Sequence, residues 1–551
     1  MMRLQLTVPT TATVENPNAI TSPRQLAEWV KDLPYANPQV TARLLLDSLH
    51  LLVRQPGSLP QLGQLMHHYL PPFRSLLDAV VKSARRQQNI AGHRSEVQLQ
   101  ELFAEITTEM SYGFKRVILD NDLAGKGKLS DEEAAESLYY AIDSLCLELM
   151  FSYAGYLQAS TNVWREISQL FLLAEQRKVA RMPVETRRCD EEINTDIRLI
   201  FKRITLIHLL DPYRLQRGEV WAYYDYLACW AQHARVGNLK EKNIPASCFL
   251  LDLHGNQKPF AYDPEKPPGD PSHYLVLDIS PLNQEIHRQM QVLKAKPNTP
   301  IAGVSKRAGG STERMIRNML LAWHVQPHRR HPREERFDWL IAACGIAATQ
   351  HFLLEGKLTA VTHEPEAVAV VDAEAGEEAE AIEILDLQQA GPSGYDTQRW
   401  RQVNLSASGV GIVLNPADAG GLQVGQAVLL ESERRGGQGS WVIGIVRRLI
   451  QRDRSTLETG IQFIRGTIHP ATIRPEVFGT QDSADLQPAL LLDAGDEHPE
   501  VLLTPHLIYH KGREYVVEDH AGKTIRVTAN RLVESTLCFD RFEYSKVSLH
   551  G

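Results

Sequence analysis

The sequence predicts a multidomain α+β protein, with an N-terminal all-α helical domain followed by a small antiparallel β-barrel and further C-terminal β strands. From residue 23 to about residue 240, apolar residues recur at helical spacing. Between residues 400 and 465, short runs of β-branched and apolar residues are separated by turns rich in glycine and proline. A chain of 551 residues is long enough for several domains, each with its own core.

Composition narrows the functional class. The chain is 43% hydrophobic and 23% charged, which is typical of a folded soluble protein. Its formal net charge of −8 argues against a general nucleic-acid binder. The six cysteines are scattered without a Cys-x-x-Cys pair, and no run of about 18 apolar residues is present. We therefore expect reduced thiols, no membrane insertion and a cytoplasmic location.

The helical domain is expected at residues 23–240, after a flexible tail at residues 1–22. Six to nine helices are expected, without a strict repeat. Their local signals are the apolar stripe from Pro38 to Val53, the breaker Pro71-Pro72, the capping box of Ser130 and Glu133, and Asp211-Pro212 at the start of a helix from Tyr213 to Ala234.

Three further regions are expected after the helical domain. Residues 241–325 combine short β-type runs with two helical patterns and predict a mixed α/β connecting region. Residues 326–480 predict the barrel, interrupted by an acidic insertion at 363–390 that has many alanines. Residues 481–551 contain more β-type runs, which either form a second β unit or extend the first.

The most informative stretch is the strand predicted from Trp400 to Ile412. Its side chains alternate with period two, and its polar face carries Asn404, Ser406 and Ser408. The strand ends at Gly409 and Gly411, where a missing side chain lets another group approach the backbone. This pattern predicts a strand with a small polar face that is open to a ligand.

The densest cationic cluster of the chain lies upstream and contains Arg329, Arg330, Arg333 and Arg336. A guanidinium group donates two parallel hydrogen bonds to a phosphate, or to O6 and N7 of guanine, and it also stacks on a base. Several arginines on one short loop can therefore hold a compact dianion and recognise guanine.

Together, the spacing of Arg329 and Arg333 and the pattern Asn404-x-Ser406-x-x-Gly409 resemble the signature of the PilZ family of cyclic di-GMP receptors. The runs 441–447 and 457–463 also resemble the two late strands of a PilZ barrel. Residues 337–403 separate the two halves of the signature, which is unusually far for the family. The large N-terminal helical region also marks the chain as an atypical member.

The resemblance implies a bacterial effector that binds cyclic di-GMP and controls motility, attachment or pili through a protein partner of the helical domain. The ligand-binding residues expected from the matching positions are Arg329, Arg330, Arg333, Arg336, Asn404, Ser406 and Gly409. Three or four bidentate contacts of about 1–3 kcal/mol each are enough for micromolar binding, about −8 kcal/mol. Arg399 and Arg401 are expected to be solvated charges at the start of the strand.

Other interpretations remain open at this point. The protein is alternatively an interaction scaffold whose barrel has lost nucleotide binding, and its arginines then pair with Glu334, Glu335 or the acidic insertion. A weaker alternative uses the basic cluster for nucleic acid. A metal site at His324, His328 and His331 is not expected, because prolines break the helix and no cysteine or carboxylate has ligand spacing. No enzyme motif is recognised, and no catalytic activity is expected.

Overall fold

The computed structural model describes residues 4–57, 61–86, 94–123, 129–160, 162–188, 191–239, 248–253, 257–263, 265–296, 299–304, 312–324, 332–355, 395, 397–432, 441–476, 486–493 and 499–547. The chain divides into two compact units. The first unit is Met1–Arg330 with Ile450–Asp453, and the second unit is His331–Leu449 with Arg454–Gly551.

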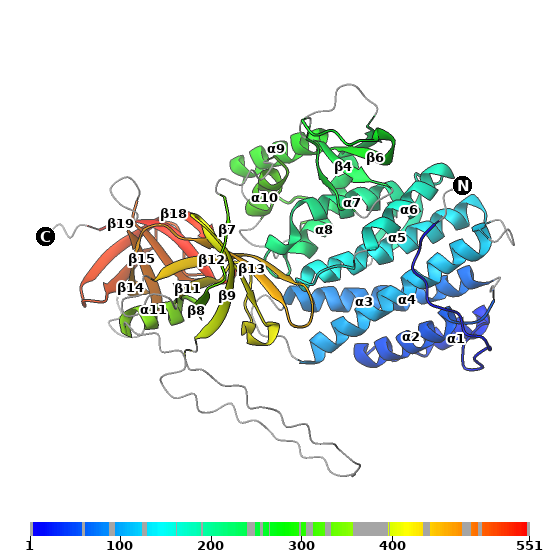
Figure 1. The fold of residues 1–551 in the computed structure, drawn as a ribbon, viewed down its shortest axis with the longest axis horizontal. Helices are drawn as coiled ribbons and strands as arrows, with labels where there is room; N and C mark the ends of the chain where they lie inside the picture. The colour runs from blue at the N-terminus through cyan, green and yellow to red at the C-terminus, as the bar shows by residue number, and fades with distance from the viewer. Residues whose placement is uncertain are drawn as a thin grey trace, which may run out of the picture. The chain divides into compact units, whose positions relative to one another are not determined.

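The first unit is mainly helical, and α4 packs against α2, α3 and α5 (Figure 1). One hydrophobic cluster extends from Leu26 to Trp323, so the connecting region shares its core with the helical domain. No described helix combines the length and hydropathy needed to cross a membrane. The helices are α1 (Pro23–Lys31), α2 (Pro38–Val53), α3 (Leu62–Arg86), α4 (Arg94–Ile118), α5 (Asp131–Ala154), α6 (Val163–Gln176), α7 (Ile197–Leu209), α8 (Glu219–Trp230), α9 (Ser280–Ala295) and α10 (Thr312–His324).

The first unit also contains β structure. A two-stranded hairpin interrupts the segment expected to be all-α, and a four-stranded antiparallel sheet of order β3-β6-β4-β5 occupies the connecting region. The strands are β1 (Val184–Arg188), β2 (Glu191–Thr195), β3 (Arg235–Asn238), β4 (Cys248–Asp252), β5 (Phe260–Ala261) and β6 (Tyr274–Asp278).

Several local predictions for this unit are confirmed. Helix α2 begins at Pro38 and ends at Val53, as its apolar stripe indicates. The capping box is formed, because the Glu133 N–H donates to the Ser130 hydroxyl and the Ser130 N–H donates to the Glu133 carboxylate. Trp221, Tyr224 and Tyr226 of α8 are buried in the core of this unit.

Three local predictions for this unit are wrong. Helix α3 continues through Pro71-Pro72, because buried neighbours such as Tyr69 and Phe73 outweigh the cost of proline in a helix, about 3 kcal/mol. Asp211-Pro212 starts only a 3₁₀ turn, since Leu215 is extended and α8 begins later, at Glu219.

The expected flexible tail is ordered from residue 4. The Gln5 N–H donates to the Gln169 side chain, the Thr7 N–H donates to Glu166, and Leu6 packs against the core.

The second unit begins with a closed six-stranded antiparallel barrel, in which β9 pairs with both β8 and β10. The predicted strands of this region are confirmed to within a few residues, whereas the acidic insertion at 363–390 lies outside the described residues. A two-residue strand, β7 (Glu334–Glu335), extends the sheet beside β9. The barrel strands are β8 (Trp339–Cys344), β9 (Gln398–Ser406), β10 (Gly409–Leu414), β11 (Ala427–Ser432), β12 (Val442–Gln451) and β13 (Leu457–Phe463).

The C-terminal strands form a second closed barrel of their own, in the order β14-β15-β16-β19-β18-β17. This barrel begins before residue 481, the expected boundary, because residues 467–475 pair with β15 and β17 and not with the first barrel. Its strands are β14 (Thr467–Pro475), β15 (Gln487–Asp493), β16 (Val501–Pro505), β17 (Glu514–Asp519), β18 (Thr524–Ser535) and β19 (Phe539–Lys546).

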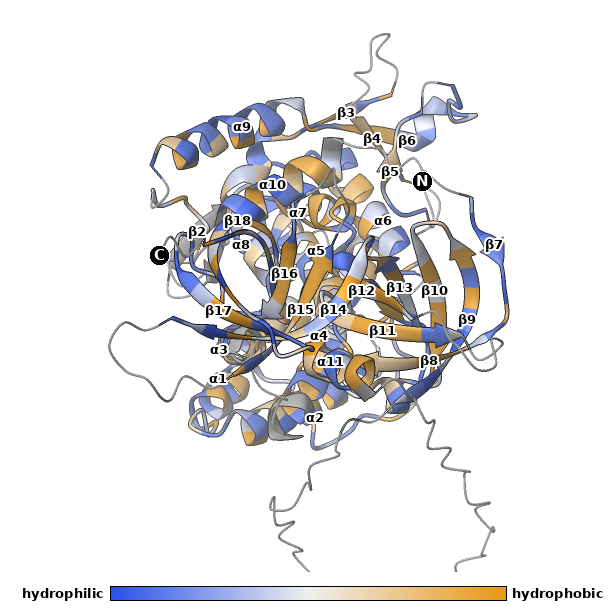
Figure 2. Ribbon diagram, turned by 90° about the vertical axis from the view of Figure 1, so that its left-hand side faces the viewer, coloured by the Kyte–Doolittle hydropathy of each residue, from blue (hydrophilic) through white to orange (hydrophobic). Residues whose placement is uncertain are grey.

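Helix α11 (Ile346–Glu355) joins the two barrels. It follows β8 directly and packs against β11 of the first barrel and β15 of the second. Ile346 and Phe352 belong to one buried cluster that includes Leu429 from the first barrel and Leu492 from the second. Strands β11 and β15 are correspondingly rich in hydrophobic residues (Figure 2). The two barrels therefore share a hydrophobic core.

Candidate functional site

The described part of the arginine segment lies beside the polar strand. Glu334 is opposite Leu405 and Glu335 is opposite Asn404 in the antiparallel pairing of β7 with β9. The Arg336 N–H also donates to the Val403 carbonyl at 3.3 Å. Strands β7 and β8 pair with successive parts of β9, so the chain returns to the same place after residues 337–403. The structure thus brings the two distant halves of the motif together.

The two described arginines of this segment, Arg333 and Arg336, are accessible. Arg333 and Arg336 are exposed, and β7 between them is hydrophilic (Figure 2). Arg336 Nη2 lies 3.2 Å from Glu334 Oε2, with 50% and 73% of the two side chains exposed. Such a surface pair contributes about 0–1 kcal/mol, so it does not prevent the guanidinium from binding another anion. Arg329 and Arg330 lie outside the described residues.

Asn404 is held at the barrel surface by the glycine opposite it. A Cβ at Gly411 would lie 2.6 Å from Asn404 Nδ2 and 2.7 Å from Oδ1, so the amide lies across the space that glycine leaves open. Among the described residues the Asn404 side chain makes no hydrogen bond. Its amide donor and acceptor therefore remain available for a base edge.

Ser406 and Gly409 occupy the turn between β9 and β10. The Ser406 hydroxyl donates to the Gly409 carbonyl at 3.1 Å and lies 3.4 Å from the Ser408 hydroxyl. A Cβ at Gly409 would collide with the Ile461 carbonyl oxygen of β13. Glycine at this position is thus already required by the neighbouring strand, whether or not a ligand approaches.

Two exposed aromatic residues beside this strand were not recognised in the sequence. Phe337 is 61% exposed and Trp339 is 42% exposed. The Arg401 guanidinium lies over the Phe337 ring at 5.7 Å from its centroid, and Arg399 lies over Trp339 at 4.3 Å. These arginines are therefore stacked on rings, where only solvation was expected. Leu340 is buried between the exposed Trp339 and the half-buried Ile341, but this uniformly apolar run carries no sequence signal for an outward face.

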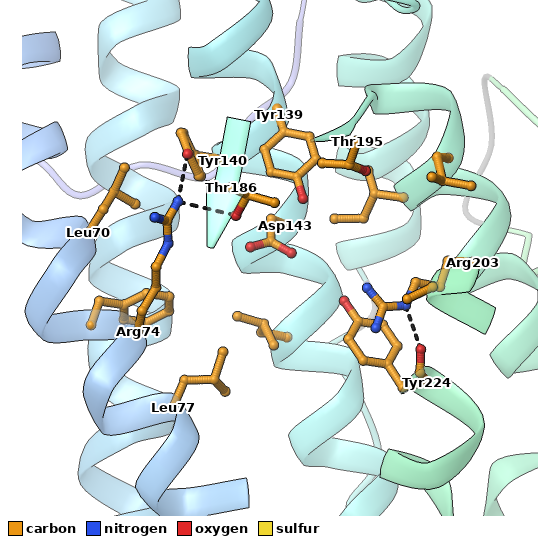
Figure 3. A pocket seen from close by; sticks show the side chains of 15 residues that line it. Leu70, Arg74, Leu77, Tyr139, Tyr140, Asp143, Thr186, Thr195, Arg203 and Tyr224 are labelled. Atoms are coloured by element: carbon orange, nitrogen blue, oxygen red, sulfur yellow. Dashed lines mark hydrogen bonds between the residues drawn. The ribbon is translucent and has the colours of Figure 1, made fainter. Parts of the chain in front are cut away.

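A small cavity in the first unit, lined mainly by apolar side chains, also contains two arginines, Arg74 and Arg203 (Figure 3). Arg74 donates to the Tyr140 hydroxyl at 2.7 Å and to Thr186 at 3.2 Å, and Arg203 donates to the Tyr224 carbonyl at 2.7 Å. The cavity measures about 60 Å³, room for about two waters at ~30 Å³ each. It is too small for a dinucleotide and serves as a buried polar network.

No metal centre is apparent among the residues that the structure describes, where no three histidine, cysteine or carboxylate side chains gather as a possible ligand set. Of the three histidines considered in the sequence, His328 and His331 lie outside those residues, and His324 is the last residue of α10.

Comparison with known proteins finds the same relative at both ends of the chain. Residues 24–241 match the family described as the N-terminal domain of the cyclic-di-GMP receptor FimW, and residues 475–547 match the FimW C-terminal β-barrel domain. Along the whole length, the chain is similar to the cyclic-di-GMP receptor FimW of Pseudomonas aeruginosa. The two are 22% identical, over 98% of this chain and 93% of that protein. The barrel that carries Asn404 lies between the two matched domains.

Proposed function

We propose that this chain, whose N-terminal and C-terminal parts match the two FimW domain families, is a bacterial cyclic di-GMP-binding effector. The ligand-binding site is the face of the first barrel formed by the arginine segment and the polar strand. The observation that carries this proposal is the pairing of Glu335 with Asn404, which sets the arginines beside that strand.

The chemistry of this face fits a cyclic diguanylate. Arg333 and Arg336 provide guanidinium forks for the phosphates or for guanine O6 and N7. The Asn404 amide and the Ser406 hydroxyl provide short polar groups for a base edge. Phe337 and Trp339 offer ring faces, and base–aromatic stacking contributes about 1–3 kcal/mol per base. Arg329 and Arg330 are part of the proposed ligand set through their positions in the motif.

The position of the arginine segment in the chain suggests how binding is transmitted. Helix α10 of the first unit ends at His324, and β7 of the second unit begins at Glu334. The segment proposed to bind the nucleotide is therefore also a covalent link between the two units. A ligand that binds this link in one conformation changes the conformations available to both units.

We propose that the helical unit transmits the signal to a protein partner. A protein partner that recognises the helical unit would respond to the bound state, and motility, surface attachment or pilus control are the processes that the family resemblance suggests. A cytoplasmic location and a purely binding role, without catalysis and without a metal, belong to the same proposal. The free state of the five described cysteines supports a reducing compartment.

The test is calorimetric titration of the full-length protein with cyclic di-GMP at fixed salt. We expect micromolar binding by the unmodified protein and at least tenfold weaker binding by Arg333→Ala, because a charge-assisted fork is lost. Arg454→Ala is the matched control, since Arg454 is also an exposed arginine of the same unit. It should bind as tightly as the unmodified protein.

A titration that detects no binding would contradict the proposal. No heat and no displacement of a labelled nucleotide at high micromolar concentration would refute the receptor function. The barrel would then serve as an interaction scaffold, in which mutation of the arginines leaves partner capture unchanged with or without nucleotide.

A further inference from the structure

A second group of arginines lines a pocket where the two barrels of the second unit meet, which we call the barrel-junction pocket. It measures about 340 Å³, within the range of about 300–1,000 Å³ typical of small-molecule sites. Its walls come from β12 and the end of β13 in the first barrel and from β18 and β19 in the second. The arginines that line it are Arg447, Arg465, Arg531 and Arg541.

Two of these arginines are oriented by one carboxylate. Glu534 accepts hydrogen bonds from both terminal nitrogens of Arg447, and it lies 3.1 Å from Arg541 Nη2. Arg447 is in β12 and Glu534 is in β18, so this contact also connects the two barrels. Because one carboxylate serves two guanidinium groups, their positive charge is only partly compensated.

The other two arginines increase the excess of positive charge. Arg531 pairs with Glu543 through Nε, at 3.0 Å, and Nη2. Arg465 is exposed and makes no ion pair among the described residues. Four guanidinium groups thus meet two carboxylates, which leaves an excess charge suited to a dianion.

Arg541 also has an unused donor. Its Nε is buried and has no hydrogen-bond partner within the described residues. A buried donor without a partner costs about 1–3 kcal/mol, which an incoming acceptor would recover. Burial lowers the pKa of Arg541, Glu534 opposes this, and the nearby Arg447 lowers it further.

The pocket is adjacent to the polar strand but uses different side chains. Gln462 in its wall lies opposite Gly409, and its side-chain oxygen accepts from Arg447 Nε at 2.8 Å. The Phe463 N–H donates to the Ser408 carbonyl at 3.0 Å. Neither Arg333 nor Arg336, the two described arginines of the first site, lines the pocket.

We propose that the barrel-junction pocket is a second binding site, which takes the phosphate groups of a phosphate-bearing anion. Guanidinium forks match phosphate oxygens in geometry and charge. Where the anion is cyclic di-GMP itself, the inference rests on the proposed function. Where it is another phosphate compound, the site stands without that function.

Pyrophosphate is the probe, titrated calorimetrically into full-length protein at low, fixed salt. Val533→Glu places a carboxylate in the pocket wall at a residue that is 39% exposed, and Arg465→Gln/Arg531→Gln removes two exposed guanidinium groups. Both should weaken pyrophosphate binding at least tenfold, the equivalent of one charged hydrogen bond. Arg526→Gln is the matched control, because Arg526 is also in β18 but pairs with Glu476 outside the pocket.

Arg333→Ala separates this proposal from the first one, since it should retain pyrophosphate binding. Displacement of pyrophosphate from Arg333→Ala protein by cyclic di-GMP would identify the dinucleotide as the source of the phosphate. Displacement of pyrophosphate by GMP but not by cyclic di-GMP would show that the pocket takes a phosphate compound other than the dinucleotide. Failure of cyclic di-GMP to bind anywhere, with pyrophosphate still bound, overturns the receptor function alone. Equal pyrophosphate affinity in Val533→Glu, the double variant and the unmodified protein, or no pyrophosphate binding at all, overturns the pocket.

Discussion

The side-chain amide of Asn404 lies across the backbone of Gly411, its partner in the pairing of β9 with β10, in the space where a Cβ would be 2.6 Å from Nδ2. This glycine therefore positions a proposed ligand-binding residue without being one itself.

Gly411→Ala should displace the Asn404 amide and weaken cyclic di-GMP binding at least about tenfold, the effect of one lost polar contact of about 1.4 kcal/mol. Stability should change little, because the colliding atoms are the end of a flexible side chain. Titration and chemical denaturation measure the two effects. Gly460→Ala is the matched control, since Gly460 lies opposite Gly411 and an added Cβ would meet only Arg448 Cβ at 3.5 Å. Unchanged affinity in Gly411→Ala would show that Asn404 does not contact the ligand.

Gly409→Ala should act on stability first. Its Cβ would collide with the Ile461 carbonyl oxygen, which belongs to the backbone of β13 and moves only with the strand. Overpacking of this kind costs about 1–3 kcal/mol, to be measured as a lower free energy of unfolding in urea. A variant as stable as the unmodified protein would mean that β10 and β13 separate easily at this end.

Removing one partner of the buried Lys115–Glu166 pair should strongly destabilise the helical unit. Lys115 Nζ lies 2.7 Å from Glu166 Oε2, and only 2% and 3% of the two side chains are exposed. Lys115→Met leaves a buried carboxylate without its cation, at a cost of about 3–5 kcal/mol. Lys115→Met/Glu166→Gln should recover part of this loss in the same denaturation experiment. If the single variant loses less than 1 kcal/mol, water must reach Glu166.

Acid should destabilise the C-terminal barrel through Asp540. Burial raises its pKa, but hydrogen bonds from His506, Ser535 and the Tyr509 N–H outweigh burial and hold the pKa below the usual value of 3.8. Because the pKa of Asp540 is lower in the folded state than in the unfolded state, the ionised carboxylate stabilises the folded barrel. This stabilisation is complete well above pH 3.8. It is lost as the pH falls through the lower pKa of the folded state. Unfolding of the full-length protein from pH 7 to pH 2 should show a smaller acid loss in Asp540→Asn, and equal losses would contradict this role.

The sequence predicted the strands of the first barrel well, because β9 and β10 alternate with period two and are bounded by glycine and proline turns. It missed β14, whose Pro470 lacks an N–H for the ladder and argues locally against a strand. Closure of the second barrel, in which Pro470 lies opposite Leu490, outweighs that local signal. Local propensity does not contain this information, because barrel closure is a long-range property.

The candidate site was predictable only in part for the same reason. The resemblance identified Arg333 and Asn404, but the pairing across residues 337–403 depends on β7 and β8 following one edge of β9. The exposed rings of Phe337 and Trp339 were missed because an apolar run at the start of a strand resembles a core. The barrel-junction pocket has no local signal, since Arg447 and Arg541 belong to different barrels and only the tertiary fold makes them neighbours.

Helix α11 has a consequence for how this protein can be shortened. Leu429 and Ile443 of the first barrel are covered by the cluster that Leu492 and Phe539 of the second barrel complete. A truncation after Phe463 would expose this apolar surface to water, and the remaining strands would tend to aggregate rather than fold. The first barrel, which we propose binds the nucleotide, should therefore not fold without the C-terminal barrel that covers it.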